Sequence, residues 1–285
     1  MAELHSLRPA VPGVRLVPPA EPDAQVRVEL RNLTRDFVLP EGIFRAVDNV
    51  SLSVREGEFV SLIGPSGSGK STILNMIPGL LESTSGDILI DGQPVTSGGV
   101  AEKVGYVFQK DTCYPWRTAK QNIALGLEVA GVPKAVREAR VMEAIDKAGL
   151  SGFENAYPKM LSGGMRQRVS LMRTLIMRPG ILLMDEPFGA LDTHTKLEMH
   201  KLLLDVWESE RQTVLFVTHD LGEAITLSDR IVLLSARPGR VKDIFEVKLP
   251  RPRDAVRIRE SAQYATLFSE IWHSLGEEFV KGKAE

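Results

Sequence analysis

The octapeptide Gly64-Pro65-Ser66-Gly67-Ser68-Gly69-Lys70-Ser71 decides the fold of this chain. It matches the pattern G-x-x-x-x-G-K-[S/T] at every fixed position. The apolar run Phe59–Ile63 comes directly before it and is typical of a buried strand, and residues 71–80 after it are expected to form a helix. A strand, a glycine-rich loop and a helix in this order indicate a phosphate-binding loop at the edge of an α/β sheet.

The residue types of this loop suit phosphate binding. Glycines let the backbone bend so that several N–H groups face phosphate oxygens, and the following helix adds its positive end. Lys70 is expected to neutralise the β- and γ-phosphates, the Ser71 hydroxyl to hold Mg²⁺, and Thr72 to contact the α-phosphate. The alternative, a glycine loop with an unrelated surface lysine, leaves the flanking strand and helix unexplained.

A second apolar run, residues 181–184, ends in the two carboxylates Asp185 and Glu186. Sheets of α/β proteins place their ligands at the carboxyl ends of the strands, so this pair is expected beside the loop. Asp185 is predicted to support Mg²⁺, directly or through water, and Glu186 to act as the general base on an attacking water. Taken alone, the pair would be explained equally well as the solvated end of a strand.

The remaining segments alternate between strand-like and helix-like patterns. Further buried strands are expected at 214–217 and 231–234. Helices are expected at 119–149, where Pro133 starts a second helix, and at 164–177. This alternation predicts an α/β fold with a parallel sheet.

The two ends of the chain differ in character from its centre. Residues 1–25 contain five prolines and no periodic pattern, which predicts a disordered arm, with an ordered surface strap as the alternative. The alternation that begins at Val26 indicates a half-exposed strand. Residues 267–279 repeat apolar side chains at helical spacing, and this amphipathic helix is expected to pack on its own domain rather than on a membrane.

Composition excludes several classes of protein. The net charge of −2 gives no electrostatic reason to expect nucleic acid as a partner. The single cysteine, Cys113, excludes an internal disulfide and a thiolate metal cage, and it fits a reducing cytosol. No stretch approaches the roughly 18 consecutive apolar residues that cross a bilayer. The first residues lack a basic segment followed by an apolar run, so no secretory signal is expected there. At a membrane, other chains would have to supply the span.

The segment Leu161-Ser162-Gly163-Gly164-Met165-Arg166-Gln167 gives the pattern its specificity. Ser162 and the two glycines are expected to begin a helix, whose N-terminus could bind an anion. Taken alone, a Ser-Gly-Gly sequence would indicate only a helix cap. However, the phosphate loop, Leu-Ser-Gly-Gly, the Asp-Glu strand, Gly189-Ala190-Leu191-Asp192 and the strand before Thr218-His219 follow one another in a characteristic order. In this order the chain resembles the ABC transporter ATPase family, from Val26 to Val247.

The resemblance implies a fold and a domain organisation. The core would be a RecA-like P-loop NTPase with a parallel sheet, accompanied by an antiparallel β subdomain and an α-helical signature subdomain at about 110–168. The ATPase domain would cover 26–250, between the arm at 1–25 and a C-terminal helical extension at 251–285.

The resemblance also implies a shared site for ATP and Mg²⁺ between two subunits packed head to tail as a homodimer. Ser162, Gly163 and Gly164 would bind the γ-phosphate of the partner subunit's ATP. The other implied roles are contact with Mg²⁺ and the water by Gln109, contact with the γ-phosphate by His219, and communication across the dimer by Asp192.

One position in the resemblance has an alternative explanation, and another departs from the family pattern. Phe37 lies where the family stacks an aromatic ring on adenine, although it could simply belong to the core. Met165 replaces the glutamine that commonly ends the signature, and because methionine donates no hydrogen bond, a side-chain role there is lost.

Shorter stretches indicate a branch of the family. The segments 114–118, 122–127, 234–240 and 249–252 are similar to the importer ATPases for nitrate, sulfonate, taurine and related small anions. That branch implies transmembrane permease subunits, a periplasmic or lipid-anchored solute-binding protein, and a location on the cytoplasmic face of the inner membrane. Pro115-Trp116 is a candidate docking knob for the permease, with a buried core tryptophan as the alternative.

Two other functions are compatible with the motifs. One is a soluble ABC protein of DNA repair or translation; against it, residues 72–161 hold no sustained heptads and the chain carries one ATPase domain. The other is a degenerate ATPase that binds without turnover; against it, every expected catalytic group is present. We therefore expect a transport ATPase.

Overall fold

The computed structural model describes residues 24–95 and 103–281, so the predicted arm at 1–25 lies almost wholly outside the described residues. Within them, the central sheet has the strand order β10-β9-β3-β8-β7-β6. Its strands are β3 (Phe59–Ile63), β6 (Val104–Val107), β7 (Ile181–Asp185), β8 (Thr213–Val217), β9 (Arg230–Leu234) and β10 (Val241–Glu246). All neighbours pair in parallel except β10, which is antiparallel to β9.

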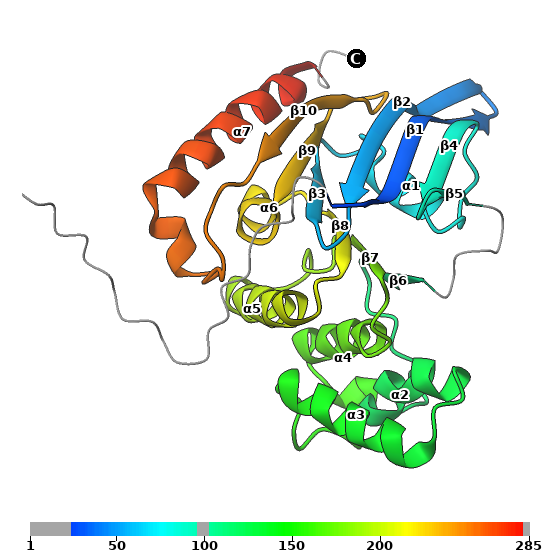
Figure 1. Ribbon diagram of the computed structural model, residues 1–285, viewed down its shortest axis with the longest axis vertical. Helices are drawn as coiled ribbons and strands as arrows, with labels where there is room; N and C mark the ends of the chain where they lie inside the picture. The colour runs from blue at the N-terminus through cyan, green and yellow to red at the C-terminus, as the bar shows by residue number, and fades with distance from the viewer. Residues whose placement is uncertain (1–23, 96–102, 282–285) are drawn as a thin grey trace, which may run out of the picture.

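Burial explains why the sequences of these strands are nearly continuous apolar runs. Every residue of β3 and β8 is buried, because helices and the second sheet cover both faces of the central sheet (Figure 1). The parallel sheet predicted from the alternation of elements is confirmed. Strand β10 was not anticipated, and its half-exposed pattern fits an antiparallel strand at the edge.

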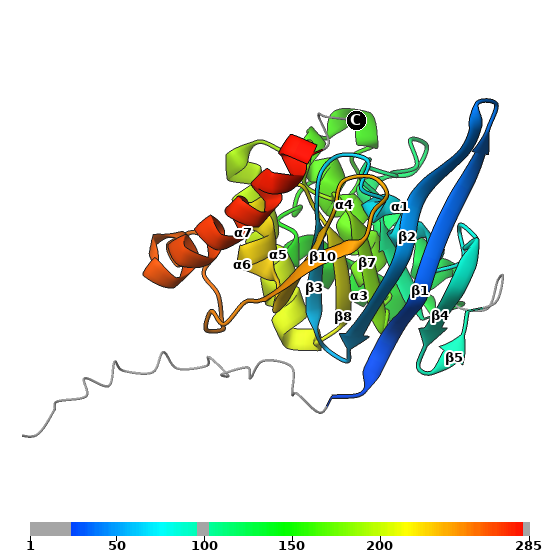
Figure 2. The ribbon, with the colours of Figure 1, turned by 90° about the horizontal axis from the view of Figure 1, so that it is seen from above.

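The second sheet is antiparallel and has the order β2-β1-β4-β5. Its strands are β1 (Val26–Leu39), β2 (Gly42–Arg55), β4 (Ser85–Ile90) and β5 (Gln93–Pro94). Strand β1 continues well past the segment at Val26–Leu30 that shows alternation, and with β2 it forms a long hairpin that projects from the body (Figure 2). The inward side chains of this sheet pack with α1 (Lys70–Met76) in one core cluster.

Helix α1 is shorter than the predicted 71–80. It ends at Met76, and Gly79 follows with a φ of +75°, a left-handed value that favours glycine. Pro78 stands between them and offers no N–H group to extend the helical ladder. The Pro-Gly pair therefore stops the helix earlier than the apolar pattern indicated.

A group of helices forms the lower end of the molecule in Figure 1. Its elements are α2 (Ala119–Val129), α3 (Lys134–Lys147), η1 (Pro158–Met160) and α4 (Gly163–Leu175). Thr118 and Gln121 form a capping box at the start of α2, and Pro133 caps α3, at the residue expected to start a second helix. Helix α4 runs on past residue 168 and contacts β6, so it joins this group to the central sheet.

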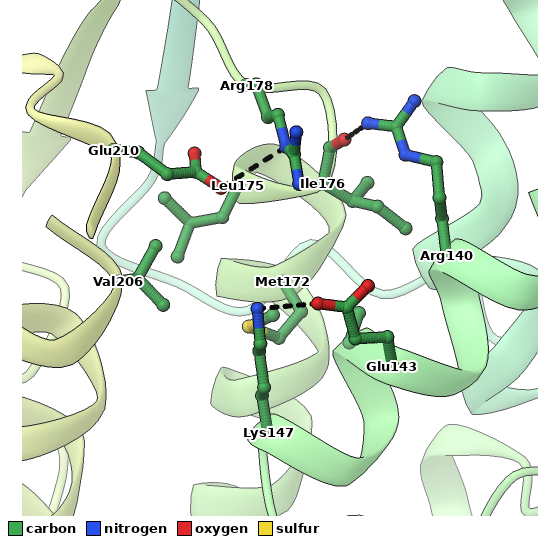
Figure 3. A pocket seen from close by; sticks show the side chains of 10 residues that line it. Arg140, Glu143, Lys147, Met172, Leu175, Ile176, Arg178, Val206 and Glu210 are labelled. Carbon is green, nitrogen blue, oxygen red and sulfur yellow. Dashed lines mark hydrogen bonds and ion pairs between the residues drawn. The ribbon is translucent and has the colours of Figure 1, made fainter. Parts of the chain in front are cut away.

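Side chains of these helices and of α5 (Thr193–Glu210) line a small cavity at the seam between them (Figure 3). Ion pairs border it between Lys147 and Glu143, at 2.8 Å, and between Arg178 and Glu210, at 3.2 Å. The remaining cavity of about 40 Å³ has room for a few waters at most. The seam is therefore a packing contact and not a substrate site.

The C-terminal part packs on the central sheet. It comprises α6 (Leu221–Leu227), η2 (Arg257–Glu260) and α7 (Ala262–Lys281). Ile271 and Leu275 of α7 share a core cluster with α6 and β9, so the amphipathic helix packs on its own domain as predicted. No helix in the described ranges combines the length and the apolar character needed to span a membrane.

Trp207 of α5 is one of the largest side chains of the core. Its ring is 1% exposed, lies edge-on to Phe59 and donates its N–H to the Gln212 carbonyl. We expect Trp207→Ala to lower the free energy of unfolding by about 3–5 kcal/mol, because a large cavity is left behind. The measurement is urea and thermal unfolding.

The control is Trp116→Ala, which truncates a tryptophan that is 70% exposed. We expect its free energy of unfolding to stay within about 0.5 kcal/mol of the parent chain. Equal changes in the two variants would contradict the placement of Trp207 in the core.

Candidate functional site

The carboxyl ends of four parallel strands meet at one edge of the central sheet, and the predicted site residues follow them. The phosphate loop follows β3, Gln109 follows β6, Asp185 ends β7 with Glu186 directly after it, and His219 follows β8. A cavity of about 520 Å³ opens at this edge. Its lining includes the phosphate loop, Thr72, Gln109 and Glu186. Parallel pairing thus brings together residues that are far apart in the sequence.

The phosphate loop is packed so closely that side chains would not fit at its glycines. A Cβ atom on Gly64 would lie 2.8 Å from the Leu234 carbonyl oxygen, and one on Gly69 would lie 2.7 Å from a methyl of Val47. Gly69 also has a φ of +81° as it caps α1. Strand β9 and the antiparallel sheet therefore hold the loop from two sides.

Lys70 closes the loop from within. Its Nζ donates to the carbonyl oxygens of Gly64, at 3.0 Å, and Pro65, at 2.9 Å. Burial lowers the pKa of Lys70, and the negative charges of Glu186 and Asp185 oppose that shift. The ammonium group is thus positioned inside the loop that is predicted to surround phosphate.

Ser71 and Asp185 form a pair of oxygen donors beside the loop. The Ser71 hydroxyl donates to Asp185 Oδ1 at 2.8 Å. Burial raises the pKa of Asp185, against the hydrogen bond from Ser71. Hard oxygen donors fit Mg²⁺, yet no group of three or more His, Cys, Asp or Glu suited to a metal occurs in the part of the chain that is described. A cation at this pair would need further oxygens, and bound phosphate or water would supply them.

Two side chains, those of Gln109 and His219, converge on one carboxylate oxygen of Glu186. Glu186 Oε2 accepts from Gln109 Nε2 at 3.2 Å and lies 3.0 Å from His219 Nδ1. Glu186 also has a φ of +43°, a value that costs a non-glycine residue free energy and that clusters at functional sites. The sequence placed these three residues at strand ends, but it gave no signal for the left-handed backbone.

The backbone of Glu186 has its own supports. Its N–H donates to the Val217 carbonyl at 2.9 Å, and its carbonyl accepts from Gly189 N at 3.2 Å. Behind His219, the Thr218 hydroxyl donates to the buried carboxylate of Glu223 at 2.6 Å, and Lys196 lies 3.3 Å from the other oxygen of that carboxylate. The contacts of Glu223 were not anticipated, because Lys196 lies on α5 and Glu223 on α6, two helices that the sequence analysis did not identify.

The signature residues lie outside the phosphate-loop cavity of their own chain. Ser162 caps α4, where its Oγ accepts from Met165 N at 3.2 Å, and neither it nor the following glycines line the cavity. Asp192 caps α5 through Thr195, whose methyl would lie 2.7 Å from a Cβ atom on Gly164. The structure thus groups Asp192 with the signature segment and separates both from the phosphate loop.

An aromatic pair forms the outer wall of the cavity. Phe37 of β1 pairs across the hairpin with Phe44 of β2, and both rings line the cavity while packing partly against the core. The guanidinium of Arg35 lies 4.6 Å from the centre of the Phe37 ring. Phe37 therefore combines features of both sequence-based alternatives. Phe44 and a further lining residue, Arg237, were missed because only the folded hairpin and the end of β9 bring them to this wall.

Comparisons with known proteins agree on one family. A family model described as ABC transporter matches residues 47–189. An uncharacterized ABC transporter ATP-binding protein of Methanocaldococcus jannaschii is 45% identical over 257 residues, which is 90% of this chain and 94% of that protein. The aliphatic sulfonates import ATP-binding protein SsuB of Bacillus cereus is 43% identical over 226 residues, which is 79% of this chain and 88% of that protein.

A solved structure gives the same result. The dimeric structure of a post-hydrolysis state of an ATP-binding cassette, bound to ADP and Pi, matches with a TM-score of 0.71 and 36% identity. The match covers 78% of this chain and 99% of the other. With the P-loop NTPase fold and the ordered motifs, these similarities show that the chain belongs to the ABC transporter family as an ATP-binding protein with ATPase activity.

Proposed function

We propose that this chain is the ATP-hydrolysing subunit of an importer for an aliphatic sulfonate or a similar small anion. The observation that carries the proposal is the convergence of Gln109 and His219 on the Glu186 carboxylate beside the phosphate loop. The relatives named as sulfonate import proteins support the class of solute. They also disfavour the alternative of a soluble repair or translation ATPase.

The residues at the sheet edge divide the chemistry among them. The phosphate loop and Lys70 bind the β- and γ-phosphates, and Ser71 with Asp185 would hold Mg²⁺, which offsets phosphate charge. Glu186 accepts the proton of the attacking water. Gln109 and His219 orient Glu186 and the water, and His219 also faces the γ-phosphate. Catalysis here is mainly positioning and charge neutralisation.

The position of the signature segment supports a dimer. Ser162 and Gly163 are exposed and lie away from the phosphate-loop cavity of their own chain. In a head-to-tail homodimer, Ser162, Gly163 and Gly164 complete the site of the partner, and Asp192 lies at the same interface. The similar solved cassette is itself dimeric. Closure of such a dimer on two ATP molecules would move the helical group α2–α4.

An exposed aromatic pair supports docking of a permease on that helical group. Trp116 stacks on Tyr114 with ring centres 5.1 Å apart, and it is 70% exposed, so the alternative of a buried core tryptophan is wrong. Trp116 is proposed to contact transmembrane subunits, on the cytoplasmic face of the inner membrane. A solute-binding protein would act on those subunits from the opposite side.

The substitution Glu186→Gln keeps the shape of the side chain and removes its basicity. ATP hydrolysis should fall at least about 100-fold, while ATP binding persists because the phosphate loop is unchanged. Phosphate release and nucleotide binding are measured in parallel. Glu138→Gln, an exposed position on α3, is the matched control. Turnover near that of the parent chain in Glu186→Gln would show that another group accepts the proton.

The substitution Trp116→Ala removes the exposed aromatic ring proposed to contact the permease. Basal ATPase activity should be unchanged, whereas affinity for the permease subunits encoded beside this chain should fall about 30-fold, as expected for an exposed aromatic anchor. Co-purification and transport in vesicles are the measurements. Val129→Ala, which truncates another exposed apolar side chain at the end of α2, should leave both unchanged. Normal assembly of Trp116→Ala would place the docking surface elsewhere.

A further inference from the structure

The loop at residues 235–240, between β9 and β10, packs directly on the phosphate loop. Gly239 pairs with Val47 of β2, donates to the Ala46 carbonyl at 3.0 Å and accepts from Asp48 N at 2.9 Å. A Cβ atom on Gly239 would overlap the carbonyl oxygen of Ser68. The 235–240 loop and the phosphate loop are therefore in backbone contact.

The other side of the 235–240 loop is held by the C-terminal helix. Ala236 N donates to the Glu278 carboxylate of α7 at 2.8 Å, and Glu278, 2% exposed, also pairs with Lys242 at 3.1 Å. Within the loop, the Ser235 hydroxyl donates to the Pro238 carbonyl at 3.0 Å. Contacts on both sides thus fix the backbone at residue 237.

The side chain of Arg237 extends from this fixed backbone into the phosphate-loop cavity. Its guanidinium carbon lies 5.4 Å from the centre of the Phe44 ring. A Cβ atom on Gly67 of the phosphate loop would lie 2.7 Å from Arg237 Nη2. The side chain therefore spans the wall between the aromatic pair and the phosphate loop, and it lines the same cavity as Lys70.

The charge of Arg237 is not neutralised locally. Within residues 24–95 and 103–281, no carboxylate lies at ion-pair distance from Arg237, whereas Arg240 in the same loop binds Asp48 at 2.7 Å and Arg45 binds Asp36 at 2.8 Å. An arginine without a protein anion, beside a phosphate loop, favours an anionic ligand.

We infer that Arg237 binds the α-phosphate of the nucleotide. The inference rests on the proposed binding of ATP at the phosphate loop. Lys70 lies where the β- and γ-phosphates are expected, and the Phe37–Phe44 pair lies where the base is expected. Arg237 lies between these two regions, and the α-phosphate is the anionic group of a nucleotide between the base and the β-phosphate. The proposed contact between Arg237 and the α-phosphate is therefore the same for any base.

The test is the dissociation constant of ADP for the full chain, measured by calorimetry at low salt. Arg237→Ala should weaken ADP binding about tenfold, and GDP binding by the same factor. Arg237→Lys should recover part of the affinity, since it restores the charge without the planar fork. The loss in Arg237→Ala should shrink as the salt concentration rises.

Two controls separate the possible failures. Arg240→Ala removes a paired arginine from the same loop, and its ADP affinity should stay within about twofold of the parent chain. Equal weakening in Arg240→Ala and Arg237→Ala would assign the effect to loop packing and overturn the inference. A loss for ADP without a loss for GDP would indicate a base contact and overturn the α-phosphate assignment.

Lys70→Ala distinguishes this inference from the proposed function beneath it. If Lys70→Ala abolishes ADP binding while Arg237→Ala binds like the parent chain, only the role of Arg237 is wrong. If Lys70→Ala binds ADP normally, nucleotide binding at the phosphate loop is itself wrong.

Discussion

The structure depends on a loop with no space for side chains at its glycines. Gly64 lies against the end of β9, Gly69 against β2, and Gly67 against Arg237. The central sheet, the antiparallel sheet and the 235–240 loop therefore all meet at the phosphate loop. Because protein interiors are close-packed, a methyl group at Gly64 or Gly69 would displace backbone of another element, and one at Gly67 would displace the Arg237 side chain. The same close contacts therefore fix the shape of the phosphate loop and hold the two sheets together.

Sequence reasoning was strongest where local patterns decide the structure. Buried parallel strands read as apolar runs, and polar residues directly after them must gather at one edge, so Glu186 and His219 could be placed before any coordinates. The same reasoning overextended α1, because it weighed apolar spacing above the Pro78-Gly79 stop signal. It also ended β1 too soon, since the outer half of the β1–β2 hairpin is stabilised by strand pairing rather than by burial.

Tertiary contacts explain what the sequence could not show. Phe44 reaches the cavity only because the register of the hairpin sets it opposite Phe37, and Arg237 only because Gly239 pairs with Val47. The left-handed backbone of Glu186 is likewise accompanied by hydrogen bonds to Val217, on strand β8, and to Gly189. None of these contacts has a local sequence pattern. The spacing of the motifs therefore predicts the motif residues of the site, but not the other residues that line the cavity.

The contact between Glu278 and the 235–240 loop connects the C-terminal helix to the phosphate loop. A carboxylate near the end of α7 holds a loop that touches Ser68, although no motif lies in that helix. Removing the chain after its last recognisable motif would therefore take away a support of the loop that packs on the phosphate loop. The final helix is therefore connected to the nucleotide-binding edge of the domain through one loop, and its side chains are part of the support of the phosphate loop.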